Sequence, residues 1–169
     1  VDQLFNPVTG AGASILRIGI TTDSNIEPNS PGTPTSPPTY VWDGIDGGQV
    51  WFAQQAQLYG VKRFYADSWG APAYMKTNND INNGGAICGG PNATCTTGDW
   101  RQAYANYLVQ YVDFYKQAGV PITDLSFVNE PNENVSYASL TLTTAQVVDF
   151  LKVFGPTVQA SGLPVQLNC

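Results

Sequence analysis

The fold of this chain is decided by the stretch Leu125-Ser126-Phe127-Val128-Asn129-Glu130-Pro131-Asn132. Its apolar residues predict a buried strand. Pro131 cannot donate a backbone hydrogen bond to a neighbouring strand, so we expect the strand to end with Asn129 and Glu130 at its C-terminal tip. In an α/β barrel those tips face the active site. Glu130 is therefore a candidate catalytic acid. The alternative is a solvated loop acid that happens to precede a proline.

Strand patterns and helix patterns alternate on both sides of this stretch. The predicted strands are residues 14–20, 63–67, 125–128 and 165–167, and the predicted helices are residues 50–59, 99–118 and 143–162. Asp46 with Gln49, and Thr143 with Gln146, are the spacings of capped helix starts. The helix over residues 99–118 should bury one face, which consists of Tyr104, Tyr107, Leu108, Tyr111 and Tyr115. Such alternation requires a parallel sheet, either doubly wound or rolled into a barrel.

The connecting segments favour the barrel. No glycine-rich phosphate-binding signature follows a predicted strand, so a dinucleotide-binding fold lacks its main support. Long segments of proline, asparagine, glycine and aromatic residues follow the strands instead, as in barrel enzymes. The predicted elements are about half of an eight-stranded barrel and would leave two sheet edges open. We therefore predict an α/β fold in which residues 1–169 form one partial catalytic (β/α)8 TIM barrel, a fragment of a longer protein.

The composition excludes several classes of function. The chain has no histidine, which rules out Ser-His-Asp and Cys-His nucleophiles and most zinc and non-haem iron sites. We expect no metal and no cofactor. A net charge of −6, with only seven lysines and arginines, argues against nucleic acid or anionic lipid as a partner. No apolar run reaches about 18 residues, so nothing should span a membrane.

Several features predict a secreted, extracellular protein. Only 12% of the residues are charged. Cys88 and Cys95 lie in a glycine-rich loop that can bend to close a small disulfide ring, although two free thiols are the alternative. Asn92 and Asn134 begin glycosylation acceptor triplets. Cys169 has no evident partner in the chain.

Polar side chains follow three successive predicted strands. Asp23, Asp67 and Glu130 each come at or just after a strand end. Trp69 and Tyr74, in the segment after the second strand, carry rings that can lie flat against sugars, although Trp69 could equally be a core residue that plugs the barrel mouth. A strand-end carboxylic acid with aromatic platforms and no imidazole fits hydrolysis of a glycosidic bond by two carboxylates.

The second carboxylate is not evident. Arg17 lies in a strand that should be buried, so it needs a carboxylate partner, and it either holds a catalytic carboxylate ionised or forms a structural ion pair. The chain has three glutamates, of which Glu27 is expected in a solvated rim and Glu133 in a solvent-facing loop. We expect the nucleophile to belong to a strand missing from the chain.

Four motifs, in the same order along the chain, resemble those of glycoside hydrolase family 30. The motifs are Ile15 to Ile20, Tyr65 to Asn78 (Tyr-Ala-Asp-Ser-Trp-Gly-Ala-Pro-Ala-Tyr-Met-Lys-Thr-Asn), Gly98 to Tyr104 and Phe127 to Pro131. The likeness covers nearly the whole chain and is closest to the secreted fungal endo-β-1,4-xylanase branch. It implies a (β/α)8 barrel that cleaves polysaccharide with retention of configuration. By this resemblance the chain holds strands two to five, while the other strands and a side β-domain are absent.

The resemblance also implies roles for individual residues. Glu130 resembles the general acid/base, and Asn129 beside it the residue that binds the sugar 2-hydroxyl. Trp69 and Tyr74 resemble substrate-facing residues, and Arg17 an arginine near the nucleophile. Asp67 is a further candidate for substrate binding. The family's nucleophile is a glutamate on the seventh strand, so we expect the isolated chain to be inactive.

The expected substrate is a β-linked plant cell-wall polysaccharide, most of all xylan, because of the branch resemblance. Family relatives cut β-1,6-glucan, β-1,6-galactan or glucosylceramide, and these remain alternatives. No basic residue lies between Arg17 and Lys62 to bind glucuronate, which favours neutral xylan. A non-catalytic carbohydrate-binding barrel is a different alternative. We expect the full-length protein to be a monomer.

Overall fold

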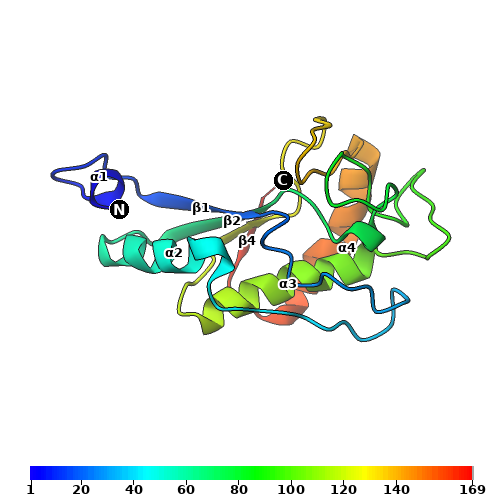
Figure 1. Cartoon of the computed structure of the whole chain (residues 1–169), viewed down its shortest axis with the longest axis horizontal. Helices are drawn as coiled ribbons and strands as arrows, with labels where there is room; N and C mark the ends of the chain where they lie inside the picture. The colour runs from blue at the N-terminus through cyan, green and yellow to red at the C-terminus, as the bar shows by residue number, and fades with distance from the viewer. Residues whose placement is uncertain (169) are drawn as a thin grey trace.

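The computed structural model describes residues 1–168, so Cys169, for which the sequence shows no evident partner, lies outside the described residues. Its centre is a four-stranded sheet in the order β1-β2-β3-β4, with all three pairings parallel (Figure 1). The strands are β1 (Ile15–Ile20), β2 (Arg63–Ser68), β3 (Asp124–Ser126) and β4 (Gln166–Asn168). The helices are α1 (Asp2–Phe5), α2 (Gln49–Leu58), α3 (Arg101–Gln117) and α4 (Thr144–Ser161), with 3-10 turns η1 (Asp46–Gly48) and η2 (Ala73–Met75).

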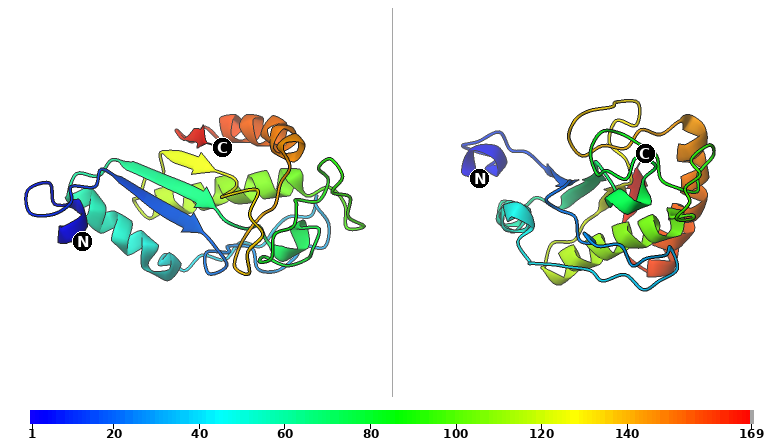
Figure 2. Two further views of the ribbon diagram at one scale, coloured as in Figure 1. Left: turned by 90° about the horizontal axis from the view of Figure 1, so that it is seen from above. Right: turned by 45° about the vertical axis from the view of Figure 1, so that its right-hand side comes forward.

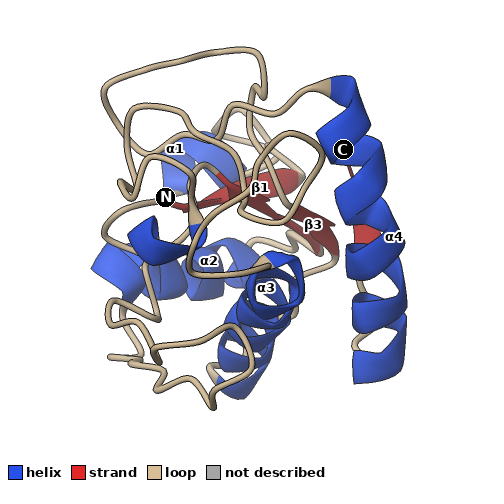
Figure 3. Cartoon of the chain, turned by 90° about the vertical axis from the view of Figure 1, so that its right-hand side faces the viewer, coloured by secondary structure: helices blue, strands red, loops and turns tan. Residues whose placement is uncertain are grey.

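The sheet is wound in one direction. Strands follow one another in sequence order, and α2, α3 and α4 lie along the same face of the sheet (Figures 2 and 3). A doubly wound sheet would reverse its strand order and place helices on both faces. The arrangement is that of a barrel wall, which confirms the predicted fold class.

The two faces of the sheet differ in chemistry because side chains alternate along each strand. The helix-covered face is apolar and buried, and it includes Ile18, Ile20, Phe64, Ala66 and Leu125. The opposite face is polar, and it carries Arg17, Arg63, Tyr65, Asp67, Asp124 and Ser126, as the register of the strand pairs requires. In a closed barrel this second face would line the interior.

Helix α3 fixes the C-terminal ends of the central strands. The predicted face of five residues is buried, as expected. The hydroxyl of Tyr104 donates to the carbonyl of Phe127 at 2.7 Å and lies 2.9 Å from Ser68 Oγ. Phe127 itself packs against Phe150 of α4, with ring centroids 4.9 Å apart. The chain just before Asn129 and Glu130 is therefore held from both helices.

Predicted helix starts had mixed outcomes. Thr143 and Gln146 form the capping box at the start of α4. Asp46, in contrast, does not cap α2, because Gly48 occupies that position in a left-handed conformation. The Asp46 carboxylate is buried and accepts hydrogen bonds from the hydroxyls of Tyr111 and Tyr115, both at 2.5 Å. Two tyrosines of α3 thus use the carboxylate that the helix start was expected to use.

The long segment between β2 and α3 contains the predicted disulfide. Cys88 and Cys95 are bonded, with Cα atoms 5.4 Å apart. The carbonyl of Cys88 accepts from the backbone N–H of Trp100, which joins this ring to the start of α3. Within residues 1–168 no helix has both the length and the apolar character needed to cross a membrane.

Candidate active site

Backbone hydrogen bonds bring the ends of the first three strands together. The N–H of Trp69 donates to the carbonyl of Ile20 at 2.9 Å, and the N–H of Asn129 donates to the carbonyl of Ser68 at 2.7 Å. Pairing thus continues past the end of β3, although Phe127 and Val128, predicted as part of that strand, lie outside it. Trp69, Asn129 and Glu130 consequently share one edge of the sheet.

Four of the predicted site residues form one connected chain of contacts. The Arg17 guanidinium is hydrogen-bonded both to the carboxylate of Asp67 and to Oδ1 of Asn129. Asn129 then donates through Nδ2 to Oε2 of Glu130 at 3.1 Å. Because the amide oxygen of Asn129 is engaged by Arg17, its N–H groups must face Glu130.

Arg17 is not buried, contrary to expectation. Its side chain is 47% exposed, whereas that of Asp67 is 3% exposed. The difference is consistent with the place of Arg17 on β1, an edge strand of the four-stranded sheet, whereas Asp67 lies on the inner strand β2. Its carboxylate partner is Asp67, on the adjacent strand.

Asp67 is an incompletely satisfied acid. Burial raises its pKa, and the hydrogen bond and charge of Arg17 oppose that rise. Its Oδ1 atom is buried and has no hydrogen-bond partner among residues 1–168. A buried carboxylate oxygen without a donor is costly, so the pair is not arranged for stability alone.

Trp69 lies on the exposed side of this group and is only half-buried. The Arg17 guanidinium carbon sits 5.4 Å from the Trp69 ring centroid, a cation–π contact. The ring centroid of Tyr137 lies 5.6 Å from that of Trp69, and Tyr137 is 50% exposed. Trp69 therefore contacts both Arg17 and the half-exposed Tyr137 at this edge of the sheet.

Glu130 occupies an unusual backbone conformation. Its side chain is exposed and its φ is +43°, in the left-handed region that non-glycine residues rarely adopt. The following Pro131 already restricts the backbone of Glu130, and the N–H of Glu133 donates to the Glu130 carbonyl at 2.9 Å. Strained residues of this kind concentrate at functional sites.

Tyr74 is placed apart from these residues. Its ring packs edge-on against Trp100 at 5.0 Å, and its hydroxyl donates to the carbonyl of Glu27 at 3.4 Å. Burial, together with Glu27, raises the pKa of Tyr74. Glu27 is itself only 2% exposed, so the expectation of a solvated rim acid is wrong. Within residues 1–168, no hydrogen bond joins Tyr74 to Glu130.

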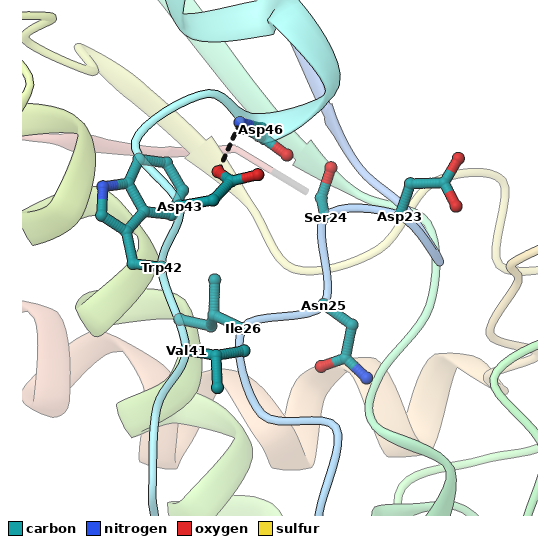
Figure 4. A pocket seen from close by; sticks show the side chains of 8 residues that line it. All are labelled: Asp23, Ser24, Asn25, Ile26, Val41, Trp42, Asp43 and Asp46. Carbon is teal, nitrogen blue, oxygen red and sulfur yellow. Dashed lines mark hydrogen bonds between the residues drawn. The ribbon is translucent and has the colours of Figure 1, made fainter.

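Asp23, a strand-end candidate, lines a separate pocket with Asp43 and Asp46 (Figure 4). The backbone N–H of Asp46 donates to Asp43 Oδ1 there at 2.9 Å. In the described part of the chain, no group of three or more potential metal-ligating residues is assembled. This pocket is therefore an acidic hollow beside the end of β1.

Two residues of the site were missed by sequence reasoning. Tyr137 is an exposed aromatic residue seven positions after Glu130, and an isolated ring in a polar loop is a weak signal. Lys76 lies in the Tyr65 to Asn78 motif, but no feature of the neighbouring sequence shows that its ammonium group is buried. The ring of Tyr137 contacts that of Trp69, and the ammonium of Lys76 binds the carbonyl of Ser139. Each contact joins residues more than sixty positions apart in the sequence.

Comparison with known proteins places this geometry among glycoside hydrolases. The profile of O-glycosyl hydrolase family 30 matches residues 35–169. The catalytic domain of a family 30 xylanase C from Talaromyces cellulolyticus superposes with a TM-score of 0.96 and 47% identity, over 99% of this chain and 39% of that one.

More distant relatives have other named activities. A putative glucosylceramidase from Caenorhabditis elegans is 32% identical over 117 residues, which are 65% of this chain and 21% of the relative. An endo-1,6-β-D-glucanase from Trichoderma harzianum is 26% identical over 131 residues, or 72% of this chain and 26% of the relative. The chain thus spans well under half the length of each of these proteins.

Proposed function

Because this chain belongs to O-glycosyl hydrolase family 30, we propose that it forms part of the catalytic domain of a retaining endo-glycoside hydrolase, with Glu130 as general acid/base. The observation that carries the proposal is the strand-end chain of contacts from Asp67 through Arg17 and Asn129 to Glu130. It links the exposed carboxyl group of Glu130 to Arg17, which also contacts the Trp69 ring, at the edge where barrel enzymes bind substrate.

The reaction follows from two carboxyl groups. Glu130 donates its proton to the glycosidic oxygen while a second carboxylate attacks the anomeric carbon, so that the leaving sugar departs and a covalent glycosyl-enzyme forms. Glu130, now ionised, removes a proton from water, which attacks the same carbon and releases the nucleophile. The Asn129 N–H bound to Oε2 leaves Oε1 of Glu130 for the transferred proton.

The remaining residues hold substrate and charge in place. The second amide proton of Asn129 is available for a sugar hydroxyl, since its oxygen is already bound by Arg17. Trp69 offers a ring face for sugar stacking. Asp67 is a poor nucleophile because it is buried and paired with Arg17. We propose that the nucleophile is a carboxylate on another barrel strand, outside these 169 residues. Its carboxyl group would lie about 5 to 5.5 Å from that of Glu130, as in retaining enzymes.

Glu130→Gln in the complete protein tests the assignment. Loss of the proton donor should lower kcat on polysaccharide by about 10² to 10⁴-fold. An aryl glycoside whose leaving group needs no proton should still release its phenol in a fast first burst. Glu133→Gln, three residues further on and also exposed, is the matched control and should remain near wild type. Equal losses in both variants, or none in Glu130→Gln, would contradict the assignment.

We propose xylan as the substrate, most of all the unsubstituted β-1,4-linked chain. The support is the 47% identity to a xylanase catalytic domain over nearly the whole chain, against 26% to the 1,6-glucanase. Parallel assays of the complete protein on xylan, β-1,6-glucan, β-1,6-galactan and glucosylceramide decide among them. The isolated 169 residues should release no sugar from any of the four, because they lack the nucleophile. Saccharide binding without turnover by the complete protein would favour a carbohydrate-binding barrel.

Secretion and glycosylation at Asn92 and Asn134 belong to the same proposal. A structural disulfide is typical of oxidising compartments, and both asparagines are exposed to a glycosyltransferase. Treatment of the secreted protein with an endoglycosidase should lower its mass, and Asn92→Gln and Asn134→Gln should each remove one step. Gel filtration of the full-length protein should show a monomer.

A further inference from the structure

The ammonium group of Lys76 is enclosed by backbone carbonyls. Lys76 is 2% exposed, and its Nζ lies 2.5 Å from the oxygen of Asp80, 2.9 Å from Ile81, 3.2 Å from Asn82 and 2.8 Å from Ser139. No carboxylate within residues 1–168 forms an ion pair with it. A charged group this deeply buried is stabilised here by four carbonyl dipoles, among which it shares its three N–H donors.

These carbonyls belong to two different loops. Three come from the loop after β2, and the fourth, that of Ser139, comes from the loop after β3. The same loops are paired around Lys76 by further bonds: Ser139 N–H to Ile81 at 3.2 Å, Asn83 N–H to Val135 at 3.0 Å, and Gly84 N–H to Ser139 Oγ at 2.8 Å. Lys76 therefore lies at the centre of a seam between the loops.

The seam determines how the rings of the site meet. The loop after β3 runs from Glu130 to Thr141 and presents Tyr137 to Trp69. Next to Trp69, a side chain at Gly70 would approach the Ile81 carbonyl to 2.7 Å, so the loops also pack directly against the Trp69 backbone. The bonds of this seam hold the Tyr137 loop against the loop after β2, and Tyr137 itself is half exposed.

We propose that Lys76 is a positioning residue that holds Tyr137 against Trp69, and that the two rings form a sugar-binding platform next to Glu130. This inference rests on the proposed function and adds to it a second substrate-contacting ring. Without the ammonium, the four carbonyls lose their shared donor, and we expect the loop after β3 to separate from the loop after β2. Tyr137 then leaves Trp69, and the platform is lost while Glu130 remains.

A double-mutant cycle in the complete protein tests the proposal. Lys76→Met and Tyr137→Ala should each raise KM for xylo-oligosaccharides about tenfold, with kcat changed less than about threefold. Since Lys76 acts through Tyr137, the double variant should be no more than about twofold worse than the worse single variant. Lys62→Met, at an exposed lysine before β2, is the control and should keep wild-type KM.

A second variant covers the case in which Lys76→Met does not fold. A side chain at Gly84 would lie 2.5 Å from Thr141 Oγ1 and 2.9 Å from Asn134 Oδ1, so Gly84→Ala pushes the loops apart without touching Lys76. It should raise KM in wild type and leave KM unchanged in Tyr137→Ala. Additive effects in either cycle, or an unchanged KM in the folded single variants, would overturn the proposal.

Oligosaccharide titration by calorimetry separates this inference from the proposed function. If the protein cleaves no glycan but binds xylo-oligosaccharides, the same cycle read as binding constants still decides the role of Lys76. If Glu130→Gln behaves as expected and the cycle is additive, the function stands and the Lys76 inference fails.

Discussion

Two arginine–aspartate pairs join neighbouring strands on the polar face of the sheet, one at each end. Arg63 and Asp124 connect the first residues of β2 and β3, while Arg17 and Asp67 connect β1 to the far part of β2. In both pairs the aspartate side chain is 3% exposed and the arginine about half exposed. The chemistry and the burial are alike, so the differences between the pairs come from their surroundings.

The Arg63 pair is complete. Its guanidinium binds both carboxylate oxygens of Asp124, at 2.9 and 2.7 Å. Thr123 Oγ1 donates to the same carboxylate at 2.7 Å, and Asn168 Nδ2 at 3.3 Å. Arg63, with these donors, lowers the pKa of Asp124 to about 2. Both carboxylate oxygens of Asp124 have donors, as expected for an ion pair at the N-terminal end of the barrel strands, where residues contribute to stability and not to catalysis.

The Arg17 pair is divided. Arg17 shares its donors between Asp67 and Asn129, and its face meets Trp69. Asp67 keeps one oxygen without a donor, and its pKa is raised by burial instead of lowered. The same two residue types thus stabilise the sheet at one end, and at the other end they orient Asn129 toward the proposed acid.

The largest expected effect breaks the divided pair. Arg17→Met removes the donor that orients the Asn129 amide, so the proposed hydrogen bond to Glu130 is no longer fixed. We expect kcat/KM of the complete protein to fall by about 10² to 10³-fold, together with a loss of Tm because Asp67 is left buried without its partner. The equivalent change in the complete pair, Arg63→Met, should lower Tm and leave kcat/KM within a few fold. Reversed outcomes would contradict the division of roles between the pairs.

A smaller effect is expected from the carboxylate of the complete pair. Asp124→Asn keeps the size of the side chain but removes the negative charge that pairs with Arg63. It also places an amide N–H donor where the neighbouring side chains already donate. The free energy of unfolding should fall by about 2 kcal/mol, as measured by urea denaturation of the complete protein. Asp113→Asn, at a helix position outside any ion pair, provides the control for charge removal. A loss of the same size there would refute a specific role for Asp124.

The smallest effect is a difference in pH dependence. The folded-state pKa of Asp124 is lowered, so its contribution to stability is present above about pH 4 and is lost as the pH falls through about 2. The folded-state pKa of Asp67 is raised, so as the pH rises above about 4 the unfolded state loses this proton before the folded state does. The stability contributed by Asp67 therefore falls in that range. Asp124→Asn should flatten the acid limb of the stability curve, and Asp67→Asn the limb above it. Identical changes in both variants would remove the distinction.

Sequence reasoning succeeded where the signal is local. The capping box at Thr143, the buried face of α3 and the disulfide of Cys88 and Cys95 were all predicted correctly. Glu130 was placed at a strand end because a proline stops the pattern there. The predicted surroundings of Asp46 and Glu27 were wrong, because those surroundings come from other elements. Asp46, for example, is bound by tyrosines 65 and 69 positions away in the sequence.

The sequence by itself determined the alternation of strands and helices, the family and the position of the proposed acid, because periodicity, caps and proline stops act over a few residues. Only the tertiary structure decided that Arg17 is half exposed, that it binds Asp67 and Asn129 together, and that Lys76 is caged by carbonyls from two loops. These depend on which face of the sheet the helices cover and on contacts between segments far apart in the chain. No local pattern encodes which distant group will satisfy a buried charge.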